Sequence, residues 1–115
     1  MVIFHDPRCA EYVAAGHPER PARVVRSAAF LREAHPGWEW RVPNEASDEA
    51  LTRAHTTAHV ERVRAAPHDF DADTPAYEGV FGHAARAAGA ACAVAQLSLG
   101  GEKAVFHAVP PALKV

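Results

Sequence analysis

Cysteine is scarce in this sequence, and so are long apolar runs. Cys9 and Cys92 are the two cysteines among 115 residues, and neither belongs to a Cys-x-x-Cys pair. We therefore expect two free thiols in a reducing cytoplasm, without a disulfide framework or zinc knuckle. Val2-Ile3-Phe4 is too short for the core of a signal peptide. No segment approaches the run of about 18 apolar residues that spans a bilayer, so we expect no membrane contact.

An excess of charge of one sign is also lacking. The chain has 12 Lys and Arg residues against 14 Asp and Glu residues, which gives a formal net charge of −2. The two signs are interspersed, so neither a basic stripe nor an acidic tail is present. A glycine-rich phosphate loop is missing too, because Gly100-Gly101 follows a predicted helix and does not open one. Nucleic acid is therefore not an expected partner.

Large aromatic side chains are few, with five Phe, two Trp and two Tyr among 49% apolar residues. Alanine supplies much of the remaining apolar surface, so the expected core is small. A length of 115 residues suits one domain and is too short for two. Trp38 and Trp40 alternate with charged residues, which predicts a half-buried strand that covers part of this core.

Periodicity and capping residues divide the chain into alternating strands and helices. Pro21 suits the first turn of a helix, Ser47 is a good N-cap, and Gly100-Gly101 ends the longest helix. We predict helices over about 21–35, 48–54, 57–66 and 77–99, and strands over about 2–4, 38–42 and 103–109. This alternation predicts an α/β fold with a parallel sheet, in one domain that covers residues 1–115.

Four short motifs follow one another over nearly the whole chain. They are His17-Pro18-Glu19-Arg20-Pro21-Ala22-Arg23, Pro43-x-x-Ala46-Ser47-x-x-x-Leu51-x-x-x-His55, Asp71-x-Asp73-Thr74-Pro75 before an Ala-rich helix, and Val109-Pro110-Pro111 after an apolar strand. In this order they resemble the histone deacetylase and acetylpolyamine amidohydrolase family. The resemblance implies the N-terminal portion of an arginase-like, three-layer α/β domain, here truncated.

The resemblance also implies zinc chemistry that this chain does not carry. Family members bind Zn²⁺ through an Asp-x-His pair and a second Asp later in the chain, and the metal activates a water for amide hydrolysis. Two histidines after Pro-Pro-Gly handle the proton. Here Ala112, Leu113 and Lys114 occupy the Gly-His-His positions. We therefore assign no catalytic residue, no metal ligand and no cofactor to these residues.

One functional position carries over from the resemblance. Asp73 matches the rim aspartate that hydrogen-bonds the substrate backbone or amine in the family, a suitable role for a carboxylate. The alternative is that Asp73 caps the helix predicted to start near Tyr77.

Two other polar groups invite a catalytic interpretation. His55 and His59 have the i, i+4 spacing of a helical metal site, but no Glu follows His55 and Thr56 is expected to cap the helix after it. Glu19 and Arg20 lie at a loop-to-helix junction, where a salt bridge that holds the turn is the favoured role. We predict no zinc at the first pair and no catalysis at the second.

Two functions remain open. The favoured one is a non-catalytic family member that binds or self-associates, because truncation leaves a sheet edge and a helix face uncovered. The alternative is the N-terminal fragment of an active zinc-dependent deacetylase that hydrolyses acetyl-lysine or acetylpolyamine amides. An acetylated amine is an expected substrate only if the rest of the domain is present.

Overall fold

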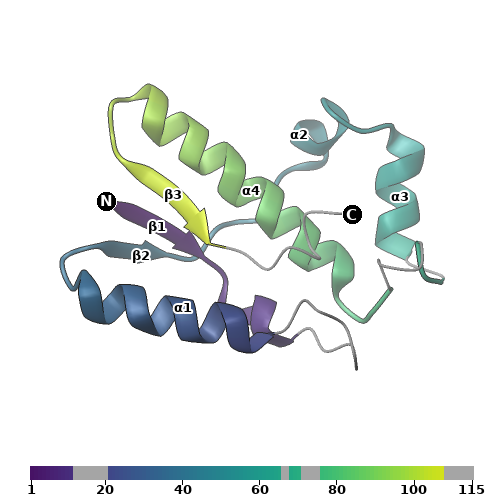
Figure 1. Ribbon diagram of the computed structural model, residues 1–115. Coiled ribbons are helices and arrows are strands. Elements are labelled where there is room, and N and C mark those ends of the chain that lie inside the picture. The colour runs from purple at the N-terminus through teal and green to yellow at the C-terminus, as the bar shows by residue number, and fades with distance from the viewer. Residues whose placement is uncertain (12–20, 66–67, 71–75, 108–115) are drawn as a thin grey trace.

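A parallel sheet of three strands, in the order β2-β1-β3, forms the centre of the structure (Figure 1). The computed structural model describes residues 1–11, 21–65, 68–70 and 76–107. The strands are β1 (Val2–His5), β2 (Glu39–Arg41) and β3 (Ala104–His107). In the register, Val2 lies opposite both Glu39 and Ala104. The expected α/β architecture with a parallel sheet is confirmed.

Helices α1 (Pro21–Ala34) and α4 (Val80–Leu99) lie on opposite sides of this sheet (Figure 1). The 3₁₀ helix η1 (Pro7–Glu11) contacts α1, and helices α2 (Asp48–Thr52) and α3 (Thr57–Ala65) pack on each other beside α4. Among the described residues, no helix is both long enough and apolar enough to cross a bilayer.

The core lies between β1 and α4. All four residues of β1 are buried, as expected for a central parallel strand covered on both faces. Val2 and Phe4 pack against Ala90, and half-buried residues of α4 and β3 surround them: Ala93, Val94, Leu97 and Ala104. Side chains alternate along a strand, so Ile3 and His5 point to the other face, toward α1.

Small residues in α4 let the loop after β2 approach the helix axis. A Cβ added at Gly89 would lie 1.9 Å from the backbone oxygen of Asn44. One turn away, the Ala46 N–H donates to the Ala85 carbonyl at 2.9 Å. The small residues of α4 therefore allow close packing within the chain itself.

Several predicted boundaries need correction. Helix α4 begins at Val80 and not at Tyr77, because Gly79 has a φ of +81°, which a right-handed helix does not accommodate. Strand β2 excludes Trp38, whose ring stacks on His35 at 3.7 Å in the preceding turn. Strand β1 extends to His5, since that residue still pairs with β3.

Four further ends differ from the prediction. Helix α1 ends at Ala34, α2 ends at Thr52, β2 ends at Arg41 and β3 begins at Ala104. The helix predicted to reach residue 66 is described to Ala65, and the predicted strand end at 108–109 lies outside the described residues.

Candidate functional site

Polar side chains gather where β1 and β3 end. His5 is the last residue of β1 and Asp6 follows it, while His107 ends β3 directly opposite His5 in the register. Ligands of open α/β sheets bind beyond the carboxyl ends of the strands. This end of the sheet is therefore the candidate functional site.

Asp6 is buried and holds two arginines. Its Oδ2 accepts a hydrogen bond from Arg86 Nε, and both side chains are about 10% exposed. Its Oδ1 accepts from the backbone N–H of Arg8 at 3.1 Å and from Arg8 Nε at 2.8 Å. Burial by itself would raise the pKa of Asp6, but the hydrogen bonds from Arg8 and Arg86 outweigh it and keep this pKa below its ordinary value. The carboxylate is charged at neutral pH and ties β1 to α4.

Arg86 extends this network into α4 and the loop after β2. Its Nη2 donates to His83 Nδ1 at 3.2 Å, and its Nη1 donates to Glu45 Oε1 at 3.4 Å. Burial, followed by the charge of Arg86, lowers the pKa of His83. Because Nδ1 accepts, His83 is neutral and carries its proton on Nε2. The network places one fixed cation among two carboxylates and a neutral imidazole.

A second polar group joins β1, β3 and α1. The Nδ1 atoms of His5 and His107 lie 3.3 Å apart, and His5 Nδ1 is also 3.2 Å from the His107 carbonyl oxygen. His107 Nε2 lies 2.7 Å from Ser27 Oγ. The Trp40 ring meets the His5 ring edge-on at 5.6 Å. Burial is the main cause that lowers the pKa of both histidines, and Arg32 lowers both further.

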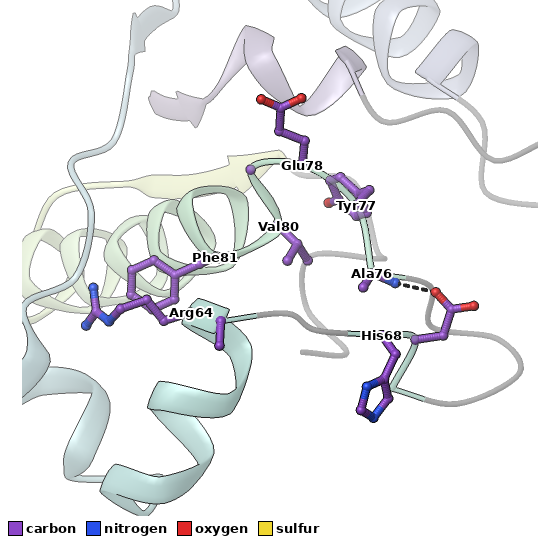
Figure 2. A pocket seen from close by; sticks show the side chains of 10 residues that line it. Arg64, His68, Ala76, Tyr77, Glu78, Val80 and Phe81 are labelled. Atoms are coloured by element: carbon purple, nitrogen blue, oxygen red, sulfur yellow. Dashed lines mark hydrogen bonds between the residues drawn. The ribbon is translucent and has the colours of Figure 1, made fainter.

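Two surface hollows lie near the start of α4. One of about 500 Å³ is lined by Glu11, Tyr77, Glu78, Gly79, Gly82, His83 and Arg86. The other, of about 490 Å³, lies between α3 and the segment before α4 (Figure 2). There the Arg64 guanidinium lies 4.1 Å over the Phe81 ring, and the Ala76 N–H donates to Asp69 Oδ1 at 2.8 Å. Both hollows are open to solvent. The first is lined in part by His83 and Arg86, which belong to the Arg86 network.

Five of the residues weighed for function lie outside the described residues. Asp73 falls in 71–75, Glu19 and Arg20 fall in 12–20, and Leu113 and Lys114 fall in 108–115. The rim role of Asp73 and its alternative as a helix cap therefore stay predictions.

The structure does place the His55 and His59 pair. Their ring centres are 5.2 Å apart. His55 precedes α3, and Thr56 Oγ1 accepts from the His59 N–H at 3.1 Å, so the predicted cap is confirmed. Throughout the part of the chain that is described, no three His, Cys, Asp or Glu side chains are arranged to hold a metal ion.

The described residues do not fit the zinc that the resemblance implies. In the pair His5 and His107, the two Nδ1 atoms face each other and the second nitrogen of His107 faces Ser27. His5 Nδ1 also approaches the His107 carbonyl oxygen. No step of hydrolysis is derived through these residues.

Sequence reasoning missed both polar groups. One signal was available, because β1 and β3 both end in Phe-His and pair in the same register. Asp6 and Arg86 gave no such signal, since only the packing of α4 against the sheet brings residues 80 positions apart into contact.

Comparison with known proteins agrees with this fold. The family model described as the histone deacetylase domain matches residues 17–113. The crystal structure of the HDA15 HD domain superposes with a TM-score of 0.82 and 30% sequence identity, over 95% of this chain and 34% of the other. This chain thus spans about a third of that structure. None of the curated proteins matches it. The chain belongs to the histone deacetylase family, as part of its α/β domain.

Proposed function

We propose that these residues act by assembly and not by catalysis, pairing with a second copy of the chain through edge strand β3. The free edge of β3 carries the proposal. Among the described strands β3 pairs only with β1, and its Val105 is 43% exposed. An unpaired edge offers N–H and C=O groups to another strand.

Self-association through one edge strand is expected to be symmetric. A symmetric dimer would use the same patch on both copies.

Sedimentation velocity over a range of protein concentrations tests this assembly. We expect the wild-type chain to form dimers and Val105→Lys to remain monomeric, because a lysine on the edge disfavours strand pairing. Val42→Lys is the matched control, since Val42 is 57% exposed and directly follows β2, the strand at the opposite edge of the sheet. A wild-type monomer at all concentrations would contradict the proposal, and so would dimers of Val105→Lys.

We propose that the chain is not catalytic because of its sequence. Leu113 and Lys114 stand where the family has its two histidines, and neither replaces an imidazole as a base near neutral pH. We expect no hydrolysis of an acetyl-lysine peptide by the 115-residue chain, with or without added Zn²⁺. We also propose a reducing cytoplasm as its compartment, since neither Cys9 nor Cys92 forms a disulfide.

A second candidate is that the chain is the N-terminal third of an active zinc-dependent deacetylase. The structural comparison favours it, since 95% of this chain superposes on 34% of the HDA15 HD domain. Fusing residues 1–111 to the remaining two thirds of an active family member tests it, with release of acetate from acetyl-lysine or acetylpolyamine amides as readout. An active fusion that loses substrate affinity in Asp73→Asn would support this candidate and the rim role of Asp73. A folded but inactive fusion would favour assembly.

A further inference from the structure

Three side chains from three elements form one hydrogen-bonded chain at the carboxyl ends of the strands. Ser27 comes from α1, His107 from β3 and His5 from β1. Ser27 Oγ contacts His107 Nε2 at 2.7 Å, and the two Nδ1 atoms contact each other at 3.3 Å. Through these side chains the end of edge strand β3 is connected to both β1 and α1.

Only one arrangement of protons satisfies all of these contacts. The Ser27 hydroxyl lies 2.8 Å from the Arg23 carbonyl oxygen, which can only accept, so the hydroxyl proton points there. Ser27 Oγ must then accept from His107 Nε2–H. That leaves His107 Nδ1 without a proton, as an acceptor for the His5 Nδ1–H, which is shared with the His107 carbonyl. Both imidazoles are neutral in this arrangement.

An additional proton is unfavourable on either imidazole. On His107 it would occupy Nδ1 and face the Nδ1–H of His5 at 3.3 Å. On His5 it would occupy Nε2 and create a cation on a residue that is only 6% exposed.

The charges around the pair do not favour a cation. From α1, the Arg32 guanidinium lies 4.3 Å over the Trp40 ring and opposes positive charge on both imidazoles. From β2, the neighbour is the uncharged Trp40 ring itself. The Asp6 carboxylate, which directly follows β1, favours positive charge on His5, but it is already held by Arg8 and Arg86.

We propose that His5, His107 and Ser27 form a proton-sensitive clamp. The neutral clamp fixes the end of β3 to β1 and α1, and protonation of either imidazole releases that end from the sheet. The inference does not depend on self-association, because it concerns how one chain holds its own edge strand.

Hydrogen exchange of the β3 peptide in the wild-type 115-residue chain tests the clamp between pH 7.5 and 5.5. After correction for intrinsic exchange, we expect the opening equilibrium of residues 104–107 to rise as pH falls. Release coupled to one or two protons gives a rise of about 10-fold to 100-fold per pH unit over the steepest part. An opening equilibrium that does not change with pH would overturn the proposal.

Variants assign the pH dependence to the pair. His107→Gln keeps a donor for Ser27, and His5→Asn keeps a donor near Nδ1, but neither residue titrates. In the double variant we expect the opening of β3 to become independent of pH. His35→Gln is the control, because His35 is exposed in the turn after α1, and it should behave as wild type. Unchanged pH dependence in the double variant would overturn the clamp.

A measurement on the wild type covers the case in which the double variant does not fold. Long-range ¹H–¹⁵N spectra report which imidazole nitrogen carries the proton. At pH 7.5 we expect His107 protonated on Nε2 and His5 on Nδ1. A proton on Nδ1 of His107 would overturn the arrangement on which the clamp depends.

Discussion

At the scale of single residues, the buried ion pair of Asp6 and Arg86 joins the end of β1 to the middle of α4. A buried pair contributes little net stability, since desolvation offsets much of the attraction, but either charge alone in the same place is costly. When the Asp6 carboxylate is removed, Glu45, at 3.4 Å, is the carboxylate that Arg86 still contacts. Removal of one partner should therefore destabilise the fold more than the intact pair stabilises it.

Asp6→Asn should lower the free energy of unfolding by about 3 kcal/mol, because it leaves the Arg86 cation buried without its main counter-ion. Urea denaturation at pH 7.5 measures the loss. Arg8→Ala is the control, because the Arg8 side chain is 49% exposed and an exposed partner contributes at most about 1 kcal/mol. An equal loss in the two variants would show that Arg86 is not the cation that requires Asp6.

At the scale of elements, the contact between α4 and the loop after β2 depends on one glycine. In an exposed helix, Gly→Ala stabilises by about 1 kcal/mol, because alanine has the higher helix propensity. At Gly89 the added Cβ would lie 1.9 Å from the Asn44 oxygen and 3.0 Å from the Ala46 nitrogen. Both atoms belong to the backbone, so the loop itself would have to move.

We therefore expect Gly89→Ala to destabilise the chain by about 1–3 kcal/mol, the usual cost of overpacking. Hydrogen exchange should also show faster exchange of the Ala46 amide, which loses its bond to the Ala85 carbonyl. Gly37→Ala is the matched control, since a Cβ there meets nothing within 4 Å. Its unfolding free energy should stay within about 0.5 kcal/mol of wild type. A stabilised Gly89→Ala would mean that the loop is not held against α4.

The sequence predicted elements better than it predicted their contacts. Ser47 was predicted as a cap, and its hydroxyl does accept from the Ala50 N–H at 3.1 Å. Capping is local, so a few residues decide it. The start of α4 was missed because the left-handed conformation of Gly79 overrides a continuous helical pattern. The His5 and His107 pair depends on strand order and register, which connect positions 102 residues apart, so the shared Phe-His ends of the two strands do not by themselves predict the contact. The prediction for Asp73 came from family resemblance and lies outside the described residues.

At the scale of the whole molecule, the chain is a slab of 42 × 34 × 16 Å with a radius of gyration of 14.7 Å. A compact domain of this length has a radius of gyration of about 13 Å. One layer of sheet with a long helix on each side produces this flat shape, in which few residues lie far from solvent (Figure 1). The stability of such a slab depends heavily on the few buried polar groups that connect its layers.

Mild acid should therefore destabilise the whole chain before its carboxylates titrate. The pKa values of His5, His83 and His107 are all lowered, chiefly by burial, so the unfolded chain binds protons more readily than the folded one. Stability is then complete above the ordinary histidine pKa of about 6.5 and falls as pH decreases below it, by up to about 1.4 kcal/mol per pH unit for each proton taken up. Asp6, whose pKa is lowered, adds a second loss only near pH 4 and below.

Urea denaturation from pH 8 to pH 4.5 resolves the two steps. We expect a constant free energy of unfolding above pH 7 and a decrease between pH 6.5 and 5, with proton uptake on unfolding in the same range. His35→Gln should leave the curve unchanged, while the His5→Asn, His107→Gln double variant should keep only the part due to His83. A constant free energy down to pH 5 would mean that the buried imidazoles accept protons in the folded chain as easily as in the unfolded one.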